Sequence, residues 1–465
     1  MLKFLRLGTN DCMSFAKKIQ IDTSVSGILK IIIPLILSCL SSSMMFLIDR
    51  FILMRYSLDA MNAAMLGGNL AGLYAFLLMA ITGTTEIFVG QCNGAGEYDK
   101  IAAPVWQMIY LVIFTAIFYV PIGYFSDHLN LIPAYYAKDG IAYQRLLTYF
   151  CWMPGLAAAF TGFFIGRGQT KIITIIVVLG NLINAVLDYL LVFGVKGIIP
   201  SLGCKGAAEA TIIAETIQIL ILAGGFWSSK NRQHFHTAKN YKFDKKLFKK
   251  CLTVGLPMSL GRGAELFAWY LVYAALSHVS RDLATAHGIA TTVYVLIAFI
   301  CDSLSKGTAA ISANFIGKKD LASIGMVLKK LTILTLILCF IFMFPLLISP
   351  RILCGILGTI NEDITHLYPT LSIIFKIQFI NIVIESQCAI FWGTLISGGD
   401  TKYINVTNLI GLWSFVVLPV ALLYAFNRLN SAIIVHLLST CWISFCLLLV
   451  YRRYKSLKWY KSVIY

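Results

Sequence analysis

The chain has 465 residues, of which 58% are hydrophobic and 13% charged, and its mean hydropathy is +0.80. Because a soluble domain is about one quarter charged, this composition excludes an ordinary soluble enzyme or binding module and indicates a protein embedded in a membrane. The formal net charge of +17 would suit a nucleic-acid-binding protein, but the positions of the basic residues, described below, argue against that class.

Apolar segments long enough to cross a bilayer as helices recur along the whole chain. We expect an all-α integral membrane protein whose twelve transmembrane helices form two pseudo-symmetric six-helix lobes. An N-terminal segment 1–27 precedes the N-lobe 28–227, a basic linker 228–250 leads to the C-lobe 251–451, and a basic tail 452–465 follows. The predicted spans are 28–52, 62–90, 103–126, 142–165, 172–194, 207–227, 252–277, 288–316, 328–349, 366–396, 404–426 and 430–451.

The basic residues are distributed unevenly across the predicted membrane. With an even number of spans, both chain ends and the linker share one side, which carries about 25 Lys and Arg residues against about 8 on the other. Because positive charge marks the cytoplasmic side, we expect both termini to be cytoplasmic and the protein to lie in the inner (plasma) membrane. The excess charge then orients the chain and contacts anionic lipid, and we expect no nucleic-acid partner.

Three short motifs of the N-lobe return in the C-lobe in the same order. The partners are separated by about 223 to 231 residues, which indicates duplication of a whole lobe. In a membrane protein, two repeated lobes with a cavity between them are typical of a secondary transporter. The pairs are Ile33-Pro34-Leu35 with Leu256-Pro257-Met258, Thr82-Gly83-Thr84 before Gly94 with Lys306-Gly307-Thr308 before Gly317, and Gly162 to Lys171 with Gly393 to Lys402.

Ionisable residues inside the N-lobe spans are the first candidates for function, since each is costly in hydrocarbon. Counted along their helices, Asp49 lies about 30 Å and Asp188 about 24 Å from the cytoplasmic side, and Asn184 stands one turn before Asp188. A carboxylate pair with an amide partner can bind a proton or Na⁺. Two structural alternatives remain open: Asp49 can pair with Arg50, and Asp188 with Asn184 can simply join helices.

In the C-lobe, Glu265 and Glu385 lie near the middle of the membrane, where they are candidates for contact with substrate or a second cation. A local salt bridge from Arg262 to Glu265 is the alternative for the first of them. We expect Glu86 to be a solvated residue at a helix end. The roles of Glu209, Glu215 and Asp302 stay open. The 12 cysteines are scattered without paired spacings, so neither a disulfide framework nor a metal site is expected.

Several stretches resemble the multidrug and toxic compound extrusion (MATE) transporters. Residues 34–49 are similar to the first helix of that family, and residues 162–171 followed by 180–189 are similar to its fourth and fifth helices. Residues 255–265 resemble its seventh helix, and residues 393–401 resemble the end of its tenth. The resemblance covers essentially the whole chain and depends on the order and duplication of motifs that are individually weak.

The resemblance implies export of organic, often cationic, compounds in exchange for H⁺ or Na⁺, by two lobes that open alternately to either side. It implies that Asp49, Asn184 and Asp188 form the cation-coupling site of the N-lobe, and that the first helix can bend at Pro34. The partners implied are small organic substrates and membrane lipids. We expect no enzymatic activity, no cofactor beyond the coupling ion, and a monomer.

By the same resemblance, Glu265 matches a glutamate of the seventh helix, and Glu385 falls where the family often has an aspartate. The chain departs from the family pattern at Arg50, at Ile396-Ser397 and at Glu209. Acidic groups in both lobes leave the choice between H⁺ and Na⁺ open.

Two other classes remain. A lipid-linked precursor flippase of related architecture would use a cationic central cavity. This class stays open because four basic residues lie within the predicted spans: Arg50, Arg262, Lys306 and Lys376. A membrane-embedded enzyme is the weaker alternative, because we find no metal cluster, GxSxG motif or phosphate-binding loop in a suitable setting.

Overall fold

The structure is a computed structural model that describes residues 23–125, 137–348 and 365–460. Within these residues the chain is helical, apart from an isolated bridge between Val195 and Ile199. Eleven helical segments of the described chain are long and apolar enough to cross a membrane. The predicted all-α membrane class is confirmed.

Among the residues that the structure describes, the N-lobe has eight α-helices and the C-lobe seven. The short helix α10, Ser229–His234, lies in the linker. The N-lobe helices are α2 (Val25–Tyr56), α3 (Leu58–Thr82), α4 (Thr85–Ala95), α5 (Ala102–Tyr124), α6 (Ala137–Phe150), α7 (Met153–Ile165), α8 (Thr170–Phe193) and α9 (Gly203–Phe226). Those of the C-lobe are α11 (Lys245–Val279), α12 (Arg281–Gly317), α13 (Leu321–Ile348), α15 (Tyr368–Ser397), α16 (Thr401–Leu412), α17 (Leu418–Ala425) and α18 (Ala432–Lys455).

Two spans that were predicted as single helices are divided, and a third contains an irregular turn. Residues 62–90 are divided between α3 and α4, residues 142–165 between α6 and α7, and residues 404–426 contain a π-helical turn at 413–417. Pro154 stands in the first turn of α7, where the missing N–H costs nothing. The helix α11 begins at Lys245, inside the range expected for the linker, and it carries the ionisable residues Arg262 and Glu265 that make it less apolar than the other spans.

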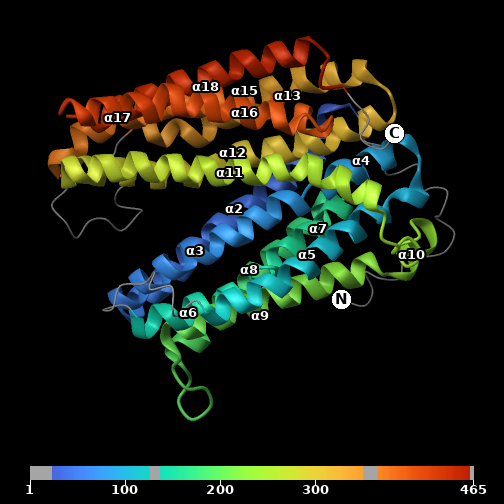
Figure 1. The fold of residues 1–465 in the computed structure, drawn as a ribbon, viewed down its shortest axis with the longest axis horizontal. Helices are drawn as coiled ribbons and strands as arrows, with labels where there is room; N and C mark the ends of the chain where they lie inside the picture. The colour runs from blue at the N-terminus through green and yellow to red at the C-terminus, as the bar shows by residue number, and fades with distance from the viewer. Residues whose placement is uncertain (1–22, 126–136, 349–364, 461–465) are drawn as a thin grey trace.

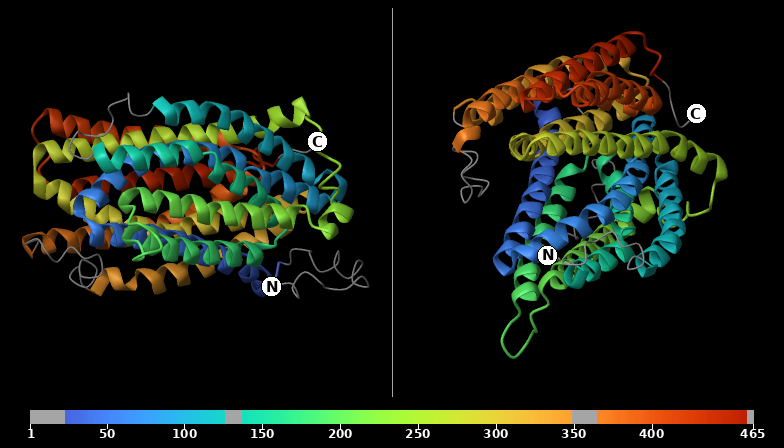
Figure 2. Two further views of the ribbon diagram at one scale, coloured as in Figure 1. Left: turned by 90° about the horizontal axis from the view of Figure 1, so that it is seen from below. Right: turned by 60° about the vertical axis from the view of Figure 1, so that its left-hand side comes forward.

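The two lobes meet at one end of the molecule and diverge toward the other. Figure 1 shows the blue-to-green N-lobe and the yellow-to-red C-lobe adjacent near α4 and α12 and spreading apart toward α6 and α17. Figure 2 shows the same two bundles from below and from the side. The linker packs on the meeting end, since Trp106 Nε1 donates to Thr237 O at 2.8 Å and His236 pairs with Asp99 at 2.7 Å. We call this end the linker end.

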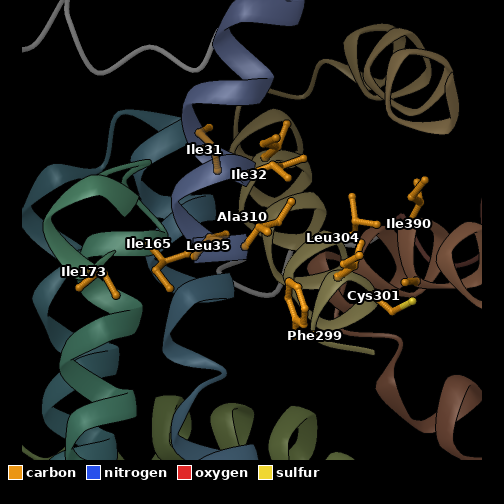
Figure 3. Packing of buried hydrophobic residues seen from close by; sticks show 14 of the residues in the cluster. Ile31, Ile32, Leu35, Ile165, Ile173, Phe299, Cys301, Leu304, Ala310 and Ile390 are labelled. Carbon is orange, nitrogen blue, oxygen red and sulfur yellow. The ribbon is translucent and has the colours of Figure 1, made fainter. Parts of the chain in front are cut away.

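A large apolar cluster joins the lobes across the meeting region. In Figure 3, Ile31, Ile32 and Leu35 of α2 lie beside Leu304 and Ala310 of α12. All five of these side chains are buried. Because burial of apolar surface stabilises contact in proportion to its area, this cluster favours the arrangement in which the linker end is closed.

In both lobes a threonine of a neighbouring helix donates to a backbone carbonyl one turn before the repeated proline. Proline lacks an N–H, so Pro34 leaves the Lys30 carbonyl without its usual helical donor. The Thr170 hydroxyl of α8 donates to that carbonyl at 3.3 Å. In the C-lobe, Thr401 of α16 donates to the Val254 carbonyl, one turn before Pro257, at 2.7 Å. The duplicated threonines therefore satisfy backbone groups near the duplicated prolines, which explains why both kinds of residue recur.

A buried cation fixes the linker to the N-lobe. Arg167 is only 1% exposed; its guanidinium lies 3.7 Å from the centre of the Phe163 ring and 4.5 Å from that of Phe235. Its Nη1 donates to Asn231 Oδ1 of the linker at 3.2 Å. Desolvated cation–π contacts contribute about 2 kcal/mol.

We expect Arg167→Ala to lower the thermal unfolding midpoint of the purified protein by about 2 °C, because it removes these ring contacts and strands the Asn231 amide. Differential scanning fluorimetry in detergent measures this shift. Lys171→Ala is the matched control, since Lys171 is exposed. An equal loss in both variants would show that Arg167 has no special structural role.

Candidate functional site

The structure brings the predicted N-lobe residues together near the end opposite the linker. Asp188 and Asn184 lie on α8 and are 0% and 1% exposed, and Asp49 of α2 is half-buried. The carboxyl groups of Asp49 and Asp188 are close enough to interact electrostatically. Two acidic groups from helices far apart in sequence thus share one buried place.

The polar atoms of this cluster lack partners among the described residues. Five buried atoms make no hydrogen bond with any described residue. They are both carboxyl oxygens of Asp188, Oδ1 and Nδ2 of Asn184, and Oδ1 of Asp49. Buried polar atoms are nearly always paired, and an unpaired buried charge is unstable. Carboxylate and amide oxygens are ligands that a small cation prefers, and such a cation would neutralise the buried charge. A proton shared by the two carboxyl groups would also neutralise it. The cluster therefore has the chemistry of a cation site.

Tyr143 of α6 was not predicted as part of this cluster. Its phenol interacts with both Asp49 and Asp188. A tyrosine in an apolar helix carries no distinctive sequence signal, so only the packing of α6 against α3 and α9 brings it here. Asn181, one turn before Asn184, donates instead to Ser41 Oγ at 2.8 Å and joins α8 to α2.

The alternative in which Asp49 forms an ion pair with Arg50 is not observed among the described residues. Arg50 is exposed, and no ion pair joins these two described residues. Adjacent residues on a helix point about 100° apart, which separates the two side chains. Asp49 is thus turned to Asp188 rather than to Arg50.

The C-lobe residues form a second, mixed-charge cluster. Arg262 Nη1 lies 3.4 Å from Glu265 Oε1, as the alternative salt bridge had suggested, and Asn408 Nδ2 lies 3.4 Å from Glu265 Oε2. Glu385 of α15 accepts a hydrogen bond from the Tyr294 hydroxyl of α12. Arg262 also interacts electrostatically with Glu385. Both predicted glutamates therefore belong to one charged region.

Glu86 was predicted to be a solvated residue at a helix end, and this prediction was wrong. The break between α3 and α4 places Glu86 in the first turn of α4, half-buried, where it interacts electrostatically with Lys306 of the other lobe. The carboxylate is also favoured by the helix N-terminus. Glu209, which had been left open, pairs with Lys205 at 3.4 Å.

A reciprocal pair of hydrogen bonds joins the lobes at the linker end. Gln91 Nε2 of the N-lobe donates to Ser397 O of the C-lobe at 2.7 Å, and Asn314 Nδ2 of the C-lobe donates to Gly166 O of the N-lobe at 2.7 Å. Each amide is fully or almost fully buried. Gln91 and Asn314 are equivalent in the repeat, as are Gly166 and Ser397.

The repeated glycines allow the lobes to approach at the same place. A Cβ at Gly94 would lie 1.9 Å from Asn314 O, and one at Gly317 would lie 2.1 Å from Gln91 O. Each amide stands three residues before its glycine, and this spacing is the same in both repeats. Together these contacts close the linker end with two-fold pseudo-symmetry.

Comparison with known proteins agrees with this architecture. The MatE family model matches residues 34–190 and 257–423. The chain is 25% identical over 308 residues to a probable multidrug resistance protein NorM of Mannheimia succiniciproducens, covering 62% of this chain and 63% of that protein. It is 25% identical over 305 residues to a probable multidrug resistance protein YoeA of Bacillus subtilis, covering 64% and 66%. The matches thus span less than two thirds of the length of these relatives.

Solved structures show the same fold. A MOP superfamily transporter from Pyrococcus furiosus superposes with a TM-score of 0.79 at 16% identity, covering 97% of this chain and 100% of that one. The family model covers both repeats and contains Asp49, Asn184, Asp188 and Glu265 within its limits. The chain therefore belongs to the MatE family and has the helices of a multi-pass integral membrane protein.

Proposed function

We propose that this protein is a secondary active transporter that exports organic, often cationic, compounds in exchange for H⁺ or Na⁺. The observation that carries the proposal is the buried cluster of Asp49, Asn184 and Asp188, whose polar atoms lack partners among the described residues. A site that needs a cation to be stable, placed in one lobe of a two-lobe membrane protein, is suited to couple ion binding to lobe movement. The names of the relatives, which are multidrug resistance proteins, support organic substrates.

The mechanism is mutual exclusion between ion and substrate. A cation entering from outside neutralises the carboxyl pair and favours release of substrate; after the ion leaves to the cytoplasm, new substrate is loaded. Only a ligand with different affinities for two states can drive such a cycle. One charge moving down about 100 mV supplies roughly 2.3 kcal/mol, enough for about a 40-fold substrate gradient.

Alternating access is supported by where the lobes touch. The amide–carbonyl bonds of Gln91 and Asn314 lie at the linker end, while the lobes spread apart at the other end (Figure 1). With the linker in the cytoplasm, as the basic residues indicate, this is a state open to the outside. The opposite state requires these two bonds to break. Their strength is modest, about 1 kcal/mol each, so a bound ligand can reverse the balance.

The C-lobe cluster is the proposed place of contact with cationic substrate. Glu265 and Glu385 come from different helices and face the same charged region as Arg262. Charged side chains at this depth are stable only when they face protein or water, so the region lines the route between the lobes. We further propose that the protein works as a monomer in the inner (plasma) membrane with both termini in the cytoplasm.

Transport in proteoliposomes tests the proposal. A Na⁺ gradient and an H⁺ gradient are imposed in separate experiments, and purified protein should expel ethidium under one of them. The gradient that drives efflux identifies the coupling ion. Transport that persists with neither gradient, or its absence with both, would contradict the proposal.

A further inference from the structure

Arg262 occupies an unusual position for a charged residue. It stands at the midpoint of α11 (Lys245–Val279), and its side chain is 54% exposed. An exposed arginine halfway across a membrane is costly in lipid, so the side chain faces the space between the lobes. The next residue, Gly263, borders the N-lobe, because a Cβ there would lie 3.4 Å from Leu77 Cδ2, so this part of α11 adjoins the other lobe.

The acidic partner of Arg262 is held in place from the other side. Asn408 Oδ1 lies 3.8 Å from Cys446 Sγ. The backbone carbonyl of Asn408 accepts a hydrogen bond from Trp442 Nε1 at 3.1 Å. These contacts fix Asn408 so that its amide nitrogen faces Glu265 Oε2. Glu265 is only 20% exposed and is thus a fixed carboxylate, whereas Arg262 is the movable member of the pair.

The ion pair itself is weak enough to exchange. The two groups are 3.4 Å apart, and the arginine is more than half exposed, so its attraction is screened by water. When Arg262 swings away, Glu265 and Glu385 stay in a region that then has an excess of negative charge. A soluble organic cation can restore the balance in place of the guanidinium.

We propose that Arg262 is a resident counter-cation of Glu265, which a cationic substrate must displace in order to bind. This inference rests on the proposed export of organic cations. The tethered charge keeps Glu265 paired while the site is empty, and it returns when substrate leaves. Arg262 therefore sets the selectivity of the site, because a neutral compound gains nothing by displacing it.

Calorimetry on the full-length protein in detergent, without Na⁺, tests this role. Arg262→Gln should lower the Kd for tetraphenylphosphonium about tenfold, since it removes a competing unit charge near a partly buried carboxylate. The Kd for the neutral triphenylphosphine oxide should not change. Arg262→Lys should keep the wild-type Kd for the cation, because it keeps the charge. Arg428→Gln, at an exposed position outside the cluster, is the matched control and should have no effect.

A double-mutant cycle separates displacement from a general charge effect. In the Glu265→Gln background, Arg262→Gln should tighten cation binding much less, because the carboxylate that pairs with Arg262 is gone and only the weaker interaction with Glu385 remains. Unchanged or weaker cation binding by Arg262→Gln, or tightening that persists in full without Glu265, would overturn the inference. Proteoliposome transport by the wild type distinguishes failure of the proposed export from failure of the proposed role of Arg262. If it succeeds while the cycle fails, only the role of Arg262 is wrong; if it fails while the cycle holds, only the proposed export is wrong.

Discussion

Asp188→Asn is expected to reduce ion-driven efflux about 100-fold while the protein still inserts and folds. The side chain is completely buried, and its carboxyl oxygens lack hydrogen-bond partners among the described residues. The amide keeps the shape but removes the charge that attracts a proton or Na⁺, and loss of a few kcal/mol of ion binding is worth a factor of that size. Ethidium efflux from proteoliposomes under an imposed gradient measures the effect.

The control for this variant is another aspartate with the same chemical change. Asp282→Asn alters an exposed carboxylate at the start of α12, which pairs with His366 at 3.3 Å. Exposed pairs contribute little, so transport should stay near wild type. If Asp188→Asn also transports normally, Asp188 is a structural residue and the coupling site lies elsewhere.

Gly94→Ala is expected to prevent closure of the linker end. The added methyl group would lie 1.9 Å from Asn314 O, so the lobes would have to move apart. Overpacking of this kind costs about 1–3 kcal/mol, which shifts the balance between the two states about 5- to 150-fold. Transport should fall below about one tenth of wild type, and amide hydrogen exchange should rise in residues 85–95 and 310–317.

Helix propensity alone predicts that Gly94→Ala stabilises α4, whereas the close contact with Asn314 predicts that it destabilises the closed linker end. Alanine is favoured over glycine inside a helix by about 1 kcal/mol, so a purely local effect would stabilise α4. Gly224→Ala is the matched control, because no atom outside its own helix lies within 4 Å of the added Cβ. If Gly94→Ala behaves like Gly224→Ala, the close contact between the lobes is not required for transport.

The amino-acid sequence was sufficient to predict the membrane class and the pairing of Asp49 with Asp188. Span length follows from bilayer thickness, and depth along two helices placed these carboxyls at similar levels although 139 positions separate them. The salt bridge from Arg262 to Glu265 followed from helical spacing, as one of two alternatives.

Other features depend on packing that a single sequence does not contain. The break between Thr82 and Thr85 turns Glu86 toward Lys306, and an uninterrupted helix would have left it at a solvated end. Tyr143 reaches the carboxyl pair only through the position of α6. The roles of Gln91 and Asn314 could be recognised only when the two repeats were brought face to face.

The most direct test of the coupling between ion and substrate is to run the cycle backwards. Proteoliposomes without any ion gradient are given an outward gradient of tetraphenylphosphonium, and internal pH and Na⁺ are followed with fluorescent indicators. If the ion and the substrate exchange, efflux of the organic cation should drive H⁺ or Na⁺ into the proteoliposomes although no ion gradient was imposed. Asp188→Asn should abolish this ion movement. Substrate efflux with no ion movement of either kind would contradict the antiport account.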